Sequence, residues 1–296
     1  MNVQYTPERN GVSLAYETSG PPENPPLLLV SGLGGQLIGW APEAVDELVD
    51  RGFFVIRFDN RDIGLSTHLH DAPRPDVQAA IHQGDTSSAS YRLEDMADDT
   101  AALLDHLGIP AAHVVGVSMG GMIAQTLAIT HPDRVLTLTS IMSTPSCQLG
   151  APTRAASDVL LAPPARSREE AVERNLKGAK VLGSPGFEAD LDWSRRSAEE
   201  AFDRSHDPEG VSRQLVAIHA SGDRSEALRS VQVPTLVIHG EDDQLIQVEG
   251  GHATAEAIPG AQLMVIPGMG HDLPRGVWAQ LLDAITEHAL SHAVGG

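Results

Sequence analysis

The sequence contains few residues of several types, and each shortage excludes a class of protein. The single cysteine, Cys147, cannot form an intrachain disulfide and is compatible with a reducing compartment. Lysine occurs only at positions 177 and 180 and the formal net charge is −20, so nucleic acids and anionic membrane surfaces are not expected partners. No stretch approaches the roughly 18 apolar residues of a transmembrane helix, and residues 1–5 have neither the basic nor the apolar character expected of a signal peptide. We therefore expect a cytoplasmic protein that binds neither membrane nor nucleic acid.

The length and the apolar pattern favour an α/β fold. A chain of 296 residues can form one large domain with an inserted subdomain. Short apolar runs alternate with helical patterns, such as those in 93–107 and 278–289, and this predicts a mostly parallel sheet covered on both faces. The strand candidates are residues 12–17, 27–31, 53–58, 113–117, 135–141, 235–239 and 262–266.

Residues 144–230 break this alternation. They contain charged helical patterns but no convincing strand, and proline–glycine groups such as Asp-Pro-Glu-Gly at 207–210 separate the patterns. We therefore predict a helical cap over residues 144–230, inserted into a core that is formed by residues 1–143 and 231–296.

The most informative motif is Gly-Val-Ser-Met-Gly-Gly at 116–121, which directly follows an apolar run. A strand followed by Gly-x-Ser-x-Gly and a helix places the serine on a sharp turn with a strained backbone. A side chain at Gly116 or Gly120 would collide across such a turn. The helix N-terminus behind the serine favours developing negative charge. Ser118 is therefore the candidate nucleophile, and a serine that merely caps the helix is the alternative.

A serine nucleophile needs a base within hydrogen-bond reach and a carboxylate that orients the base. On a parallel sheet these groups are expected in the order nucleophile, acid, base, each in a loop after a strand. The candidate base is His271, which follows the strand candidate 262–266. The sequence has 13 histidines, but small residues surround this one and leave its ring room to reach Ser118.

The candidate acid lies among three adjacent carboxylates that follow the strand candidate 235–239. Asp243, three residues after Gly240, has the spacing usual for such a loop, and Asp242 is the alternative. These carboxylates could instead cap the next helix.

Acyl transfer also needs two backbone N–H groups that bind the developing oxyanion. Met119, directly after the nucleophile, is expected to supply one. The glycine-rich loop at 32–35 follows a strand candidate, and we assign the second donor to Leu33. A phosphate-binding interpretation of this loop is weak, because no Lys-Ser/Thr ending and no Gly-x-Gly-x-x-Gly pattern is present.

These motifs occur in the same order as in the α/β-hydrolase superfamily, and the chain resembles that superfamily over essentially its whole length. The chain is most similar to aclacinomycin methylesterase and related bacterial serine carboxylesterases. The resemblance implies an α/β-hydrolase fold with an eight-stranded, mostly parallel sheet and a helical cap after strand six. It also implies ester hydrolysis through an acyl-enzyme without a cofactor or a metal. The matching segments are residues 32–35, 59–66, 116–121, 240–243 and 267–271.

Two positions depart from the pattern of the superfamily. Many relatives have His-Gly where this chain has Ser31 and Gly32, so the hydrogen bonds that shape the oxyanion loop are expected to differ. Asp62 replaces a glycine of a structural turn, and we expect Arg61 and Asp62 to serve in an ion pair or in the turn rather than in catalysis.

Substrate specificity is expected where the cap faces the three candidate catalytic residues. We expect substrate contacts from Gly32, Trp40, Met142 and Met269, although each apolar one could equally be a core residue. Aromatic residues make up only 4%, which argues against an aromatic cage. A medium-sized, mostly apolar ester with methanol or another small alcohol as leaving group fits these features.

Other functions remain open at this point. The same residues could hydrolyse lactones, thioesters or carbon–carbon bonds, or could form peracids without a cofactor, as in perhydrolases and haloperoxidases. A ligand receptor without catalysis is less consistent with an intact serine, acid and histidine. We also note a homodimer as an expected form.

Overall fold

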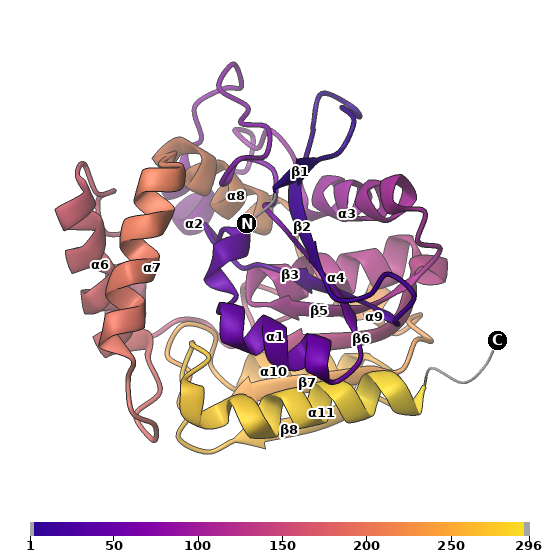
Figure 1. Cartoon of the computed structure of the whole chain (residues 1–296). Coiled ribbons are helices and arrows are strands. Elements are labelled where there is room, and N and C mark those ends of the chain that lie inside the picture. Colours follow the sequence, from indigo (N-terminus) through magenta and orange to yellow (C-terminus); the bar gives the residue numbers. More distant parts are fainter. Residues whose placement is uncertain (1–2, 293–296) are drawn as a thin grey trace.

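The computed structural model describes residues 3–292, which form one eight-stranded sheet with helices on both sides (Figure 1). The strands lie in the order β1-β2-β4-β3-β5-β6-β7-β8. β2 pairs antiparallel with β1 and with β4, and every other neighbouring pair is parallel. The strands are β1 Gln4–Tyr5, β2 Ala15–Ser19, β3 Pro26–Val30, β4 Phe54–Phe58, β5 Ala112–Val117, β6 Val135–Ile141, β7 Thr235–Gly240 and β8 Gln262–Ile266.

Helices occupy most of the connections between the strands. They are α1 Pro42–Asp50, α2 Val77–Gln83, α3 Leu93–Leu107, α4 Met119–Thr130, α5 Arg154–Leu160, α6 Arg168–Leu182, α7 Leu191–Arg204, α8 Pro208–Ala220, α9 Ser225–Leu228, α10 Glu249–Ala257 and α11 Trp278–Ser291. The described residues also contain three 3-10 turns, namely η1 Leu37–Gly39, η2 Pro132–Arg134 and η3 Arg275–Val277.

The sheet separates two hydrophobic clusters. In β3, Leu28 and Val30 pack into the cluster that contains residues of α3, α4 and α8, whereas Leu27 and Leu29 pack into the cluster with α1 and α11. Successive side chains of a strand point to opposite faces, so a strand that is buried on both faces must be apolar throughout. This requirement explains the continuous apolar runs in the sequence.

The parallel strands bring their carboxyl ends to one edge of the sheet. The loops after β3, β5, β7 and β8 therefore meet there, although they are far apart along the chain. These loops contain the candidate oxyanion loop and the three candidate catalytic residues.

The chain between β6 and β7 contains helices α5 to α9 and, in this fully described stretch, no strand. α6 and α7 lie side by side and stand apart from the sheet at the left of Figure 1, whereas α8 reaches behind them toward the sheet. The division into a core and a cap at 144–230 remains a prediction.

The strand predictions agree well with the structure. The bounds of β6 and β8 are those predicted, and the other candidates overlap a strand. The prediction at 12–17 begins too early, because β2 starts at Ala15. The one strand without a candidate in the sequence is β1, whose two residues are exposed and give no apolar signal. Within the described residues, no helix combines the length and the apolar character needed to cross a bilayer.

Candidate active site

Ser118 lies on a strained turn between β5 and α4. Its backbone angles are φ 55° and ψ −122°, in a region that residues with a side chain rarely adopt. The turn is compact enough that a Cβ at Gly116 would lie 2.1 Å from the carbonyl oxygen of Gly120. A Cβ at Gly120 would in turn lie 2.1 Å from the carbonyl oxygen of Val30. The predicted need for small residues at both positions is therefore confirmed.

A continuous line of hydrogen bonds joins Ser118, His271 and Asp243. The Nε2 atom of His271 lies 3.0 Å from Oγ of Ser118, and its Nδ1 atom lies 2.7 Å from Oδ2 of Asp243. An ionised carboxylate can only accept, so Nδ1–H of the histidine donates to it. In the neutral ring, Nε2 is then free to accept the serine proton.

Asp243 is held as a buried carboxylate. Its Oδ1 atom accepts the backbone N–H groups of Leu245 and Ile246 at 2.8 and 2.9 Å. Burial alone raises the pKa of Asp243, but hydrogen bonds from His239, His271 and the backbone outweigh burial and hold this pKa well below its usual range. The carboxylate therefore stays charged at neutral pH.

Asp242, the alternative acid, makes a different contact. Its carboxylate accepts the backbone N–H of Gly268 at 3.1 Å, and its own N–H donates to the carbonyl oxygen of Met269. These bonds connect the loop after β7 to the loop that carries His271. The geometry thus favours Asp243 over Asp242 as the partner of the histidine ring.

The backbone N–H groups of the two expected oxyanion donors, Leu33 and Met119, have no hydrogen-bond partner within the described residues 3–292. Met119 is the first residue of α4, where an N–H has no partner within the helix. Gly32 lies against the serine, since a Cβ there would be 3.2 Å from Cβ of Ser118.

The oxyanion loop has Ser31 at the position where many members of the superfamily have a histidine, and other side chains hold the loop by hydrogen bonds. The side-chain amide of Asn60 donates to the carbonyl oxygen of Ser31 at 3.1 Å, and Nε1 of Trp40 donates to Oγ of Ser31 at the same distance. The indole of Trp40 is therefore fixed by a hydrogen bond and forms part of the loop's support.

The predicted substrate contacts are only partly brought together. Trp40 lines an apolar cavity of about 60 Å³ together with Trp193 of α7 and Trp278 of α11. Met142 and Met269 are buried in the cluster beside α11 and present almost no surface to a ligand. Their place in a substrate pocket remains a prediction.

Arg61 and Asp62 have the structural roles expected of them. The guanidinium of Arg61 binds both carboxylate oxygens of Asp99 at 2.7 and 2.8 Å. Asp62 has φ +68°, the left-handed conformation that a glycine adopts easily, and its carboxylate binds the buried guanidinium of Arg213 at 2.8 and 2.9 Å.

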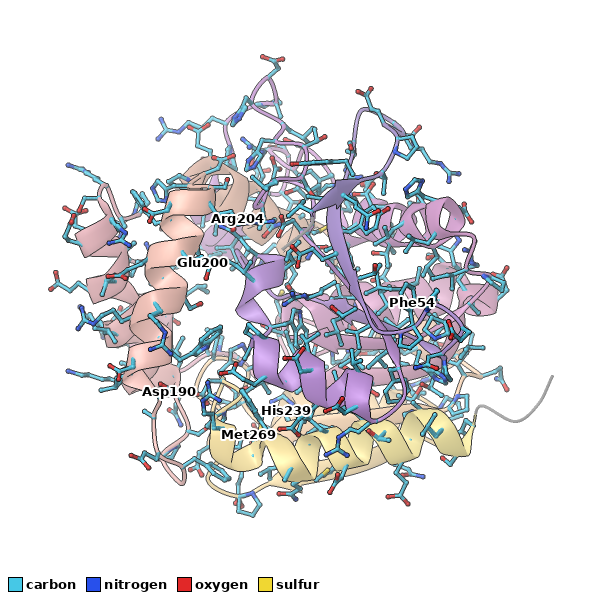
Figure 2. All side chains as sticks on the ribbon, in the orientation of Figure 1. Phe54, Asp190, Glu200, Arg204, His239 and Met269 are labelled. Atoms are coloured by element: carbon cyan, nitrogen blue, oxygen red, sulfur yellow. The ribbon has the colours of Figure 1, made fainter. Side chains whose placement is uncertain are left out.

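The segment between β6 and β7 supplies contacts that sequence reasoning missed. On α7, Arg204 forms an ion pair at 2.7 Å with Asp59, which has no exposed surface. In Figure 2, Arg204 lies at one end of α7 and Asp190 at the other. On α8, Arg213 and Gln214 are also buried. No local pattern marks such residues, because each has a partner more than a hundred positions away.

The turn between α6 and α7 contacts the loop that carries His271. The backbone N–H of His271 donates to the carbonyl oxygen of Leu182 at 2.6 Å, and that of Gly270 donates to Oγ of Ser184 at 2.8 Å. The hydroxyl of Ser184 in turn donates to the carboxylate of Asp272, and burial raises the pKa of this carboxyl group.

One cluster in the described chain has the residue types of a metal site, namely His68, His70 and Asp207. The two imidazole rings are stacked with an interplanar angle of 11°, so their lone pairs do not converge on one point. Asp207 already binds Nδ1 of His68 at 2.7 Å and lies 3.4 Å from the guanidinium of Arg213. The cluster therefore fits direct contacts of Asp207 with His68 and Arg213 better than a bound cation.

Comparison with known sequences identifies related proteins over nearly the whole chain. Residues 25–274 match the model of the alpha/beta hydrolase fold family. Rhodomycin D methylesterase DnrP of Streptomyces peucetius is 31% identical, and the match covers 96% of this chain and 97% of that protein. The 3-oxoadipate enol-lactonase 2 of Acinetobacter baylyi is 29% identical, with 86% and 85% of the two chains covered.

Solved structures with the same arrangement include hydrolases of several kinds. A hydrolase from Pseudomonas aeruginosa PA01 superposes with a TM-score of 0.73 at 25% identity and covers 99% of both chains. A thermophilic esterase from Thermogutta terrifontis superposes with a TM-score of 0.68 at 26% identity, again over 99% of both chains.

Proposed function

The chain belongs to the α/β-hydrolase fold family, and on this premise we propose that it hydrolyses carboxylic esters with Ser118 as nucleophile. The observation that carries the proposal is the line of hydrogen bonds from Oγ of Ser118 through His271 to Asp243. Each group in this line has the partner that acyl transfer requires.

In the first step, Oγ of Ser118 attacks the acyl carbon of the ester while its proton passes to Nε2 of His271. The carbonyl oxygen becomes an oxyanion, which the N–H groups of Leu33 and Met119 bind. The tetrahedral intermediate then collapses, the bond to the alcohol breaks, and His271 gives its proton to the leaving alcohol. The charged Asp243 stabilises the transient imidazolium and keeps the ring oriented.

In the second step, a water molecule attacks the acyl-enzyme and loses a proton to His271. The oxyanion forms again at the same two N–H groups, and collapse returns the proton to Oγ of Ser118. The products are the free acid and the alcohol, and the enzyme regains its starting form. No cofactor is needed to balance either step.

We propose a methyl ester or another small-alcohol ester of a medium-sized apolar acid as substrate. This proposal is supported by the two rhodomycin D methylesterases that are 31% identical to the chain. The residues 144–230 would act as the cap that shapes the acyl site, with Gly32, Trp40, Met142 and Met269 as candidate contacts. A homodimer and a cytoplasmic location stay predictions.

The proposed function is tested with p-nitrophenyl esters, methyl esters and lactones as substrates. Wild type should hydrolyse at least one ester, and Ser118→Ala should lower kcat by several orders of magnitude. Mass spectrometry of a reaction stopped with acid should detect the acyl group on Ser118. Absence of turnover on every ester, or full activity of Ser118→Ala, would contradict the proposal, and preference for a lactone would change the substrate class alone.

The acid is tested by exchanging each aspartate for asparagine. We expect Asp243→Asn to lower kcat by about 10⁴-fold, because the amide cannot stabilise the correct tautomer of His271. Asp242→Asn is the matched control, since its contact to Gly268 lies outside the line of proton transfer. The reverse order of the two effects would assign the role to Asp242.

A further inference from the structure

We propose that Gln214 of α8 is a positioning residue for catalysis, because it fixes the loop that carries the oxyanion donor Leu33. This inference rests on the proposed function. Gln214 has no exposed surface, although its side chain is polar and it lies far along the sequence from the serine.

The amide of Gln214 bridges two loops at the edge of the sheet. Its Oε1 atom accepts the backbone N–H of Gly34 at 3.0 Å, and its Nε2 atom donates to the carbonyl oxygen of Arg61 at 2.8 Å. One buried side chain thus satisfies a donor in the loop after β3 and an acceptor in the loop after β4. A hydrocarbon side chain of the same length could satisfy neither.

The bond to Gly34 acts on a tight turn. The backbone N–H of Gly35 donates to the carbonyl oxygen of Gly32 at 3.0 Å, which closes a β-turn with Leu33 and Gly34 at its centre. Gly34 has φ +67°, as the third residue of a type II turn requires. The central peptide of such a turn can rotate, and Gln214 holds this peptide by its N–H.

The position of this peptide matters because its neighbour carries the oxyanion donor. The carbonyl group of Gly32 and the N–H of Leu33 belong to one planar peptide unit. Only the two dihedral angles of Leu33 separate this unit from the peptide that Gln214 holds. Fixing the central peptide therefore restricts the dihedral angles of Leu33, and with them the orientation of the Leu33 N–H relative to the rest of the turn.

α8 itself is anchored firmly enough to act as a support. The neighbouring Arg213 is buried in its ion pair with Asp62. Val211 packs against the same turn, because a Cβ added to Gly34 would lie 3.3 and 3.5 Å from its two methyl groups. α8 therefore meets the oxyanion loop with a hydrogen bond and an apolar contact. The loop lacks the histidine that many relatives have before the first glycine, and Gln214 offers a different means of fixing it.

The test compares Gln214→Met with Ser212→Ala, a matched control on the same helix whose hydroxyl donates to the carbonyl oxygen of Pro208 in α8 itself. kcat and KM are measured with an ester, and Ki is measured with a trifluoromethyl ketone, which adds to Ser118 and forms an oxyanion. For Gln214→Met we expect kcat to fall roughly tenfold or more and Ki to rise in parallel, with KM within about threefold. Ser212→Ala should match wild type in all three.

Gln214→Glu keeps an acceptor opposite the N–H of Gly34 but places an acceptor against the carbonyl of Arg61. We expect kcat and ketone affinity to fall together in this variant, by less than in Gln214→Met. If the methionine variant does not fold, the glutamate variant is compared with wild type in its place. The inference is overturned if kcat stays within about twofold of wild type in the folded variants, or if kcat falls without a change in Ki. Failure of the proposed function would be visible separately, as activity of Ser118→Ala.

Discussion

The two helices α4 and α7 both carry residues that contact the loops of the candidate active site, yet they differ fully in burial. Residues 119–128 of α4 are all buried, and they begin directly after Ser118. α7, which the structure describes completely, has no buried residue. In α8 the residues between Gly210 and Ala220 are mostly buried, so this helix resembles α4 although it lies in the same inserted segment as α7.

The difference in burial indicates different roles for the buried helices α4 and α8 and for the exposed helices α6 and α7. α4 and α8 are packed on the loops that hold Ser118 and the proposed oxyanion donors, so their sequences are constrained by atomic contacts. α6 and α7 contact each other and reach the catalytic loops at a few points, such as Arg204 and the turn at Ser184. We infer that substrate preference can change through α6 and α7 at small cost, whereas changes in α4 and α8 affect the chemistry and the fold.

The same substitution in the two regions should have opposite effects, and this gives the largest expected change. In Gly120→Ala of α4, the new Cβ would lie 2.1 Å from the carbonyl oxygen of Val30, and neither atom can move away without a shift of the backbone that carries it. We expect a loss of more than about 5 kcal/mol in the free energy of unfolding, which abolishes folding. Circular dichroism and the yield of folded protein measure this effect.

The control is Gly178→Ala in α6, where the new Cβ would make an ordinary contact of 3.7 Å with Val159. Alanine has a higher helix propensity than glycine, so we expect the free energy of unfolding to rise by roughly 0.5–1 kcal/mol. Similar effects of the two substitutions would remove the distinction between the regions.

The next largest effect should come from the buried ion pair that anchors α8. In Asp62→Asn the backbone can keep φ +68°, because asparagine tolerates the left-handed conformation. The buried charge of Arg213 loses its closest carboxylate, and the nearest one left, that of Asp207, lies 3.4 Å away. We expect a loss of about 3–5 kcal/mol, measured by urea unfolding. Adding Arg213→Met should restore most of the loss. An equal loss in the double variant would mean that the charge pair is not the cause.

Local patterns predicted every strand except β1, and they predicted the three candidate catalytic residues because each of those residues lies in the loop after an apolar strand. They did not predict α8 as a support of the site. The group at 207–210 separates α7 from α8, as expected, and also begins α8: Asp207 caps it by accepting the N–H of Gly210, and Pro208 occupies its first position. The partners of Gln214 are set by tertiary packing, for which a single sequence contains no local signal.

A smaller loss of stability should appear in the core when the pH is lowered, because the buried His113 of β5 resists protonation. Burial, followed by the charges of His288 and His292, lowers the pKa of His113 to about 4, whereas an unfolded histidine titrates near 6.5. The unfolded chain therefore binds a proton first as the pH falls, so the stability that the neutral ring contributes is present above pH 6.5 and is lost between pH 6.5 and 4.

At pH 5 this one group should cost about 2 kcal/mol relative to pH 7.5. His113→Gln cannot titrate, so its free energy of unfolding should fall less steeply over the same range in urea titrations at several pH values. His219 and His288 also have lowered pKa values owing to burial and contribute to the slope of both proteins. Parallel slopes for wild type and variant would contradict the assignment to His113.

The smallest change in stability is expected for an exposed ion pair between α6 and α7. Arg168 of α6 lies 3.1 Å from the carboxylate of Asp203 and 3.5 Å from that of Glu199, both on α7, and all three side chains are substantially exposed. Water screens such pairs, so Arg168→Ala should lower the free energy of unfolding by at most about 1 kcal/mol. Urea unfolding at low and high salt measures this, and the difference from wild type should shrink at about 1 M NaCl, where the screening length is about 3 Å. A loss as large as that of Asp62→Asn would show that α6 and α7 are held to each other as firmly as α8 is held to the core, and the separation of tasks between the two regions would then fail.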